Sequence, residues 1–136
     1  MIPQSDPAEP NSGDDLTFHL TPEAVWLNQA EGPFYEPEGF ADTGFIHCTH
    51  GEAPLLAVAN LCYRADPRSF VILVIALARV TVEIRYEDAH RIYPHLHGLL
   101  GREAVVAVRG TVRDADGAFV AIDEPDRALV VAAHGA

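Results

Sequence analysis

The sequence contains no lysine, and its first 63 residues contain no basic side chain of any kind except histidine. Without lysine, the chain can form neither a Schiff-base lysine nor the lysine of a phosphate-binding loop. Its 20 acidic residues outnumber the nine arginines, which gives a formal net charge of −11. Residues 1–63 carry half of the acids and none of the arginines. Because this charge repels phosphate backbones, we expect no extended nucleic acid as a partner.

Cysteine and long apolar runs are also scarce. The two cysteines, Cys48 and Cys62, cannot form the disulfide framework of a small secreted domain. The longest apolar run, residues 70–78, is far shorter than the ~20 residues of a membrane-spanning helix. The first residues have neither the basic nor the apolar segment of a signal peptide. We therefore expect a soluble, cytoplasmic protein without a membrane partner.

The length of 136 residues predicts one domain, and an apolar content of 49% is ample for its core. Residues 1–15 combine three prolines with four acids and bury little, which predicts a mobile acidic tail. We therefore assign residues 16–122 to the single domain and residues 123–136 to a C-terminal tail.

Local patterns predict two helices in the first half of the chain. Thr21, Pro22 and Glu23 are typical of a helix start, so we expect a helix that continues to Gly32. Residues 52–63 place their large apolar side chains on one face and predict the second helix. The intervening segment, residues 31–43, is rich in proline, glycine, acids and aromatics, which is typical of a lid or binding loop.

Strands are predicted on both sides of these helices. Short segments and alternating segments indicate short or half-buried strands, and the apolar run predicts a central strand buried on both faces. The predicted strands are residues 16–20, 44–49, 70–78, 80–86, 103–112 and 118–122. Early helices followed by a series of strands predict an α+β fold rather than alternating βαβ units.

Five of the seven histidines lie in three segments, around His19, from His47 to His50, and from His95 to His97. Histidine and cysteine are common zinc ligands, but this spacing matches no standard zinc pattern. Strand alternation also directs Cys48 away from the face of His47, which disfavours a zinc site and a histidine-activated cysteine alike. No Gly-x-Ser-x-Gly turn is present, which excludes a hydrolase of the nucleophile-elbow kind. A structural role is the common alternative for each histidine.

Four segments in this order resemble the bacterial family called domain of unknown function 952. They are Phe18-His19-Leu20-Thr21, Gly44-Phe45-Ile46-His47-Cys48-Thr49, Ile84-Arg85-Tyr86-Glu87 and Tyr93-Pro94-His95-Leu96-His97-Gly98. The second and fourth segments are the specific ones. The resemblance extends over about residues 16–112.

This resemblance implies an ADP-ribosyltransferase-like fold, with small split sheets and two helices of the N-terminal half around a cleft. In active relatives the cleft holds NAD as a substrate. The family is most similar to the two-histidine branch, which includes the RNA 2′-phosphotransferases. Carried over to this chain, the two histidines are His19 and His47, and Thr49 follows the second one. His95 and Glu87 belong to the family's own motifs.

The residue chemistry is compatible with this implication. A neutral imidazole can bond to a ribose hydroxyl or a carboxamide, and Glu87 could stabilise an oxocarbenium-like state, although a solvated turn acid is the simpler interpretation. A pyrophosphate would need arginine, of which Arg64, Arg68 and Arg85 are candidates. The candidate catalytic residues are His19, His47 and Glu87, and the candidate cofactor-binding residues are Thr21, Thr49, Arg64, Arg85, His95 and His97.

Three hypotheses follow. The first is an enzyme that binds NAD or a related nucleotide and acts at the nicotinamide–ribose bond. The second is a degenerate member of that fold, which binds a nucleotide or another small ligand without turnover. The third is a histidine-rich metal-binding protein. RNA is disfavoured as a substrate, because no arginine precedes Arg64.

Overall fold

A computed structural model describes residues 15–123, so the predicted tails, residues 1–15 and 123–136, lie almost wholly outside the described residues. The strands are β1 (Leu16–Pro22), β2 (Phe34–Tyr35), β3 (Ile46–His47), β4 (Phe70–Ala76), β5 (Glu83–Tyr86), β6 (Pro94–His97), β7 (Leu100–Gly101), β8 (Val105–Arg113) and β9 (Phe119–Ile122). The helices are α1 (Glu23–Leu27), α2 (Phe40–Thr43) and α3 (Glu52–Tyr63), with the 3-10 turns η2 (Leu77–Arg79) and η3 (Arg102–Ala104). The predicted α+β class is confirmed.

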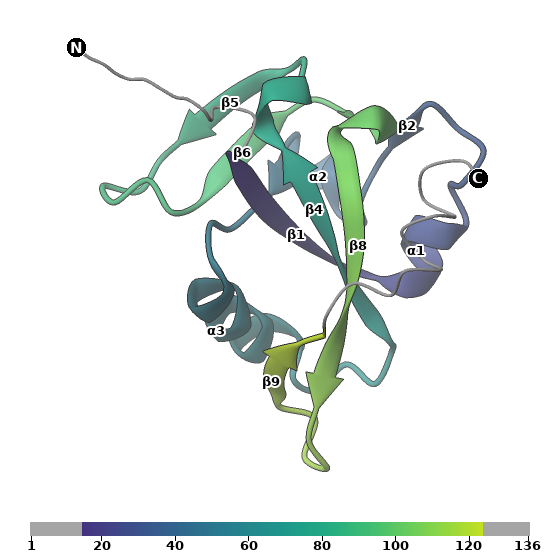
Figure 1. Cartoon of the computed structure of the whole chain (residues 1–136), viewed down its shortest axis with the longest axis vertical. Helices are drawn as coiled ribbons and strands as arrows, with labels where there is room; N and C mark the ends of the chain where they lie inside the picture. The colour runs from purple at the N-terminus through teal and green to yellow at the C-terminus, as the bar shows by residue number, and fades with distance from the viewer. Residues whose placement is uncertain (1–14, 124–136) are drawn as a thin grey trace.

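The strands form three small antiparallel sheets, in the orders β1-β4-β8-β9, β2-β7 and β3-β6-β5. In Figure 1 the long strands of the first sheet cross the middle of the molecule, with α3 and β9 beside one end and β5 and β6 beside the other. No helix within residues 15–123 is long and apolar enough to cross a membrane.

Strand β4 is the centre of the largest sheet, as its apolar run predicts. Every residue from Phe70 to Ala76 is buried, and the strand pairs with β1 on one side and β8 on the other. The neighbouring β1 is covered on both faces. Its threonines and His19 are buried, while Phe18 and Leu20 pack against clusters that include residues of α3.

The helix predicted after Thr21 is present but shorter than expected, because it begins at Glu23 and ends at Leu27 rather than near Gly32. Strand β1 continues through Thr21 and Pro22, which pair with Val71 and Phe70 of β4. Helix α1 is only five residues long and has no side-chain cap at its start. Pairing with a fully buried strand satisfies the backbone of Thr21 and Pro22, so both residues stay in β1 and the helix begins only at Glu23.

Residues 31–43 contain more regular structure than predicted. Strand β2 pairs with β7, and the four-residue helix α2 lies between two glycines in the left-handed region, Gly39 (φ 82°) and Gly44 (φ 81°). Glycine adopts this conformation without steric cost, so the two glycines allow the chain to enter and leave α2 within a few residues.

Helix α3 has the predicted bounds, and polar contacts fix it at one end of the main sheet. The Asn60 amide both donates to the carbonyl oxygen of Phe119 (3.0 Å) and accepts from its backbone N–H (2.7 Å). The Arg113 guanidinium donates to the carbonyl oxygens of Tyr63, Arg64 and Asp66, which lie at the end of α3 and just after it. Strands β8 and β9 thereby hold α3 in place as a wall above β1.

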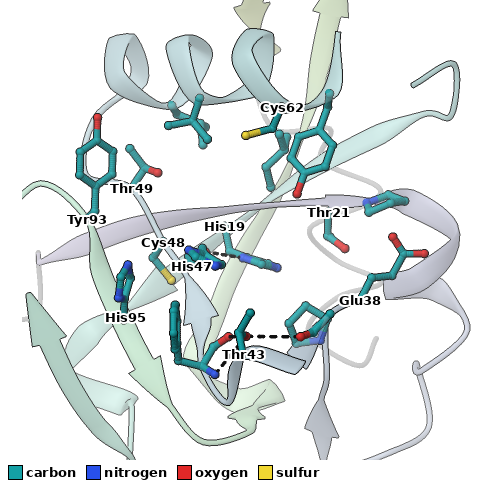
Figure 2. Close-up of a pocket in the computed structure, with 18 residues that line it drawn as sticks. His19, Thr21, Glu38, Thr43, His47, Cys48, Thr49, Cys62, Tyr93 and His95 are labelled. Atoms are coloured by element: carbon teal, nitrogen blue, oxygen red, sulfur yellow. Dashed lines mark hydrogen bonds between the residues drawn. The ribbon is translucent and has the colours of Figure 1, made fainter. Parts of the chain in front are cut away.

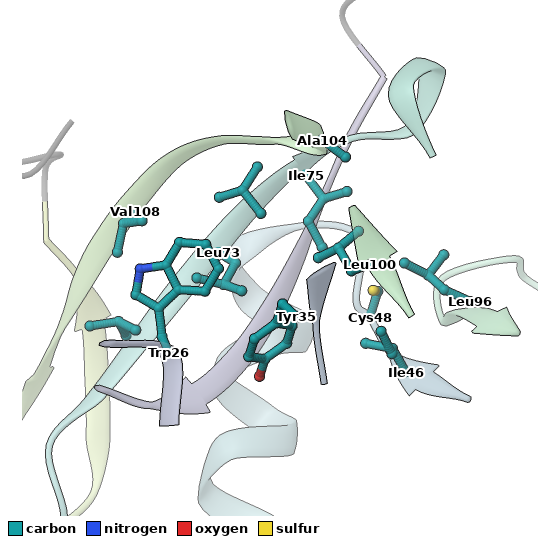
Figure 3. Close-up of a cluster of buried hydrophobic side chains, with 12 residues drawn as sticks. Trp26, Tyr35, Ile46, Cys48, Leu73, Ile75, Leu96, Leu100, Ala104 and Val108 are labelled. Atoms are coloured by element: carbon teal, nitrogen blue, oxygen red, sulfur yellow. The ribbon is translucent and has the colours of Figure 1, made fainter. Parts of the chain in front are cut away.

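The largest buried cluster joins all three sheets (Figure 3). Tyr35 of β2, Ile46 of β3, Leu73 of β4, Leu96 of β6 and Leu100 of β7 contribute to it, and all five are fully or almost fully buried. Because the two smaller sheets share this core with β4, the strands that carry the histidine motifs are fixed relative to β1.

Candidate ligand pocket

A pocket of about 360 Å³ lies between α3, the end of β1, β3 and the segment of residues 37–45. This volume is at the lower end of the range for small-molecule sites. The three histidine segments meet here, because His19, His47 and His95 all line the pocket (Figure 2). We therefore treat it as the candidate functional site.

Backbone pairing brings these segments together. Phe18 and Thr49 exchange two backbone hydrogen bonds, of 3.0 and 2.8 Å, which join β1 to the residues after β3. On the other side of β3, His47 is the cross-strand partner of His95 in β6. Thr21 and Thr49, two of the predicted cofactor-binding residues, also line the pocket.

His19 is buried, and neighbouring residues occupy both of its ring nitrogens. Nδ1–H donates to the carbonyl oxygen of His47 at 2.7 Å, which leaves Nε2 to accept from the Tyr35 hydroxyl at 2.9 Å. Burial is the main cause that lowers the pKa of His19 to about 4. This imidazole is therefore neutral near pH 7, and it offers a ligand neither a free N–H nor a free lone pair.

The imidazoles of His47 and His95 have a different environment from that of His19. Their ring centroids are 5.1 Å apart, and Phe45 stacks on His95 with a centroid distance of 4.3 Å and an interplanar angle of 16°. Within residues 15–123 neither imidazole makes a hydrogen bond to another residue. Partial burial, and secondarily the neighbouring His95, lower the pKa of His47. The pocket thus contains two accessible imidazoles side by side.

The opposite end of the pocket is acidic. Figure 2 shows Glu38 and Thr21 at one end, and Tyr93 and His95 at the other. Both carboxylate oxygens of Glu38 accept from Arg68, at 2.9 and 3.2 Å, and Arg68 also binds Asp66 at 2.7 Å. Two carboxylates share one guanidinium, so this cluster carries a net charge of −1. Glu38 is the one acidic side chain among the lining residues, and no arginine of the described chain lines the pocket.

The two cysteines have different environments. Cys48 is buried, and its burial raises the pKa of its thiol. Cys62 on α3 is an exposed free thiol in the pocket wall. No group of three or more histidine, cysteine or acidic side chains within residues 15–123 is arranged to hold a metal ion.

Four predicted site residues do not line the pocket. Arg64 is the C-terminal cap residue of α3, and Glu87 follows the end of β5. Arg85 forms an exposed ion pair with Glu83, and His97 lies beside Phe45 with a ring centroid distance of 5.2 Å. His50, from the second histidine segment, bonds to the Tyr86 hydroxyl instead.

Sequence reasoning missed several polar and aromatic residues of the pocket. Phe45 and Tyr93 belong to the segments quoted for the family resemblance, and Glu38 and Thr43 lie in the predicted binding loop. Their position in these segments is the one sequence feature that could have identified them as pocket residues. Nothing in the pattern of α3 distinguishes Cys62 from an ordinary helix residue.

Comparison with known proteins identifies a family and a shared fold. The family described as "Protein of unknown function (DUF952)" matches residues 20–108. The crystal structure of protein CC0527 from Caulobacter crescentus is similar, with a TM-score of 0.67 and 21% identity over 78% of this chain and 94% of that chain. The solution NMR structure of the same protein has a TM-score of 0.61 and 22% identity over 75% and 89%. At this level of identity the likeness shows the fold alone. No curated protein matches the chain.

Proposed function

The chain belongs to the DUF952 family, and we propose that it binds the nucleoside portion of a small nucleotide, of the NAD or ADP-ribose kind, in the pocket. One observation carries this proposal. Three histidine segments that are far apart in the sequence line a single pocket, and two of their imidazoles, those of His47 and His95, have no hydrogen-bond partner within the described chain.

The walls of the pocket suit such a ligand in size and chemistry. Neutral imidazoles and threonine hydroxyls can donate to and accept from ribose hydroxyls and a carboxamide. Aromatic rings of Phe45, Tyr63 and Tyr93 line the same space and provide faces and edges for a heterocycle. The acidic cluster at Glu38 favours a neutral or cationic ring over an anion at that end, and the nicotinamide ring of NAD is cationic.

Binding without turnover is better supported than transfer at the nicotinamide–ribose bond. The two catalytic groups that the family resemblance and the sequence suggested beside His47 are not available to a ligand in the pocket. His19 has both nitrogens occupied, and Glu87 lies outside the lining. ADP-ribosyltransferase activity, and the relation of the fold to RNA 2′-phosphotransferases, stay predictions. A metal site has only the two imidazoles in its favour.

Titration with nicotinamide riboside, followed by calorimetry and by alkylation of Cys62, tests the proposal. We expect saturable binding, a raised melting temperature and slower alkylation of Cys62, because the ligand would cover a thiol in the pocket wall. His47→Ala should weaken binding, whereas His90→Ala, an exposed histidine outside the pocket, should not.

Two outcomes would count against it. Absence of binding to nicotinamide riboside, NAD and ADP-ribose would remove the proposed ligand class. Steady release of nicotinamide from NAD, followed by chromatography, would instead favour the enzyme hypothesis over the binding module.

A further inference from the structure

The face of the β3–β6–β5 sheet that bears His47 and His95 continues beyond the pocket onto β5. The strand register places His47, His95 and Arg85 in one row across the three strands. The next row on β6 and β5 pairs His97 with Glu83. Cross-strand neighbours on one face have Cβ atoms about 5 Å apart, so the Arg85 side chain starts directly beside His95. Arg85 is therefore within side-chain reach of a group that leaves the pocket over His95.

The hydrogen bonding of His95 favours a donor that faces outward. Its Nδ1 is buried without a partner in the described chain. A buried N–H without an acceptor loses the free energy of solvation of its proton, so the favoured neutral tautomer carries the proton on Nε2. Nε2 is the nitrogen that is not enclosed, and the stack with Phe45 holds the ring in place. His95 thus presents a positioned N–H to a hydrogen-bond acceptor.

Arg85 is an arginine beside His95 in the strand register whose donors are largely unused. Arg68 uses its guanidinium on Glu38 and Asp66, and Arg113 uses its own on backbone carbonyls. Arg91 lies over the Tyr86 ring at 4.1 Å. Arg85 makes one side-chain hydrogen bond, from Nε to Glu83 at 2.8 Å, and its terminal nitrogens remain open on a side chain that is 53% exposed.

We propose that Arg85 and His95 form an anion subsite on the β3–β6–β5 sheet, which binds the 5′-phosphate group that adjoins the nucleoside in the pocket. The subsite rests on the proposed function for the nucleoside, and it adds the position and chemistry of the charged end. A guanidinium and an imidazole N–H are both suited to phosphate oxygens.

The charges along the pocket give the ligand a direction. The acidic cluster at Glu38 lies at the end opposite to His95, and no cationic side chain of the described residues lines the pocket itself. A ligand with a cationic or neutral ring and one phosphate is therefore placed with its ring toward Glu38 and its phosphate over His95. The ion pair with Glu83 reduces the positive charge of Arg85, which limits the subsite to a single phosphate group rather than a polyanion.

Inorganic phosphate tests the subsite independently of the ring. Titration of ¹⁵N-labelled protein with phosphate should shift the Arg85 Nε–H and His95 side-chain resonances in NMR spectra. Arg85→Gln should weaken phosphate binding about tenfold, because a charge-assisted bond is lost. Glu83→Gln should strengthen it, by about twofold to fivefold, since the competing carboxylate is removed. Arg79→Gln, on η2 and outside the pocket, is the matched control and should leave binding unchanged.

The outcomes separate the two proposals. Equal phosphate binding by the wild-type protein and Arg85→Gln, or no binding by either, would overturn the subsite. Nicotinamide riboside binding without any gain from its 5′-phosphate would overturn the subsite and leave the proposed function intact. Phosphate binding that depends on Arg85, without binding of the riboside, would support the subsite and count against the proposed nucleoside ligand.

Discussion

The two walls of the pocket use histidine in opposite ways. On the inner wall, the imidazole of His19 is buried, and both of its nitrogens are bonded within the protein, to the carbonyl oxygen of His47 and to the hydroxyl of Tyr35 in the core behind it. On the outer wall, formed by Phe45, His47 and His95, the imidazoles face the cavity and have no hydrogen-bond partner within residues 15–123.

This difference separates the structural histidine from those that can contact a ligand. The Nδ1–H of His19 joins β1 to the backbone of β3, and its Nε2 joins β1 to the Tyr35 hydroxyl of β2. The free energy of these bonds contributes to the assembly of the strands around the pocket. The ring nitrogens of His47 and the Nε2 atom of His95 remain available to a bound molecule. The family motifs therefore contain one histidine that stabilises the structure of the pocket and two that can contact a ligand in it.

The largest expected effect follows from removing the inner histidine. His19→Ala should lower the free energy of unfolding by about 3–5 kcal/mol, because it leaves a cavity, an unpaired carbonyl of His47 and an unpaired Tyr35 hydroxyl. Urea unfolding monitored by the fluorescence of Trp26, which lies 5.6 Å from Tyr35 between ring centroids, measures this loss. A loss below about 1 kcal/mol would show that the His19 network is not what joins the strands.

Tyr35→Phe is the matched control for that experiment. It keeps the ring in the core and removes only the hydroxyl that donates to His19, so the expected loss is about 1–2 kcal/mol. A loss as large as that of His19→Ala would assign the stabilisation to Tyr35 rather than to the histidine.

The second effect is a dependence of stability on pH. The pKa of His19 falls from 6.5 to about 4 on folding, so between these values the unfolded chain binds a proton that the folded chain does not. Stability from this residue is complete above pH 6.5 and is lost as the pH falls toward 4, by about 3 kcal/mol at 1.36 kcal/mol per pKa unit. Urea unfolding between pH 7 and 4 measures the slope. His19→Asn, whose amide N–H can replace the Nδ1–H bond without titrating, should flatten that slope, and an unchanged slope would contradict the assignment.

Sequence patterns predicted secondary structure best where the pattern of buried residues extends over a whole element. The apolar run of β4 and the one-sided pattern of α3 gave the correct elements, because each signal extends over a whole element. The pattern at Thr21-Pro22 predicted a helix start, but pairing with β4 keeps both residues in β1. That pairing is a long-range contact, and local propensity carries no information about it.

The residues of the candidate site were predicted in part, but their long-range contacts were not. His19, His47, His95, Thr21 and Thr49 were named from the sequence, and all five line the pocket. The sequence does not reveal that a carbonyl and a tyrosine hydroxyl occupy both nitrogens of His19, since these partners lie 28 and 16 residues away. The alternation of residues 16–20 predicted a strand but did not reveal that both of its faces are covered, the polar one by β2 and the β3–β6–β5 sheet.

The smallest effect on stability is expected on the outer wall. His47→Ala should change the free energy of unfolding by no more than about 0.5 kcal/mol, because the residue is exposed and its imidazole makes no hydrogen bond within the described chain. The backbone carbonyl that accepts the His19 bond remains in this variant. Affinity for nicotinamide riboside should nevertheless fall by about fivefold, the value of one lost neutral hydrogen bond. Urea unfolding and calorimetry on the same preparation measure both quantities. A destabilised variant with unchanged affinity would remove the distinction between the two walls, since His47 would then act as His19 does.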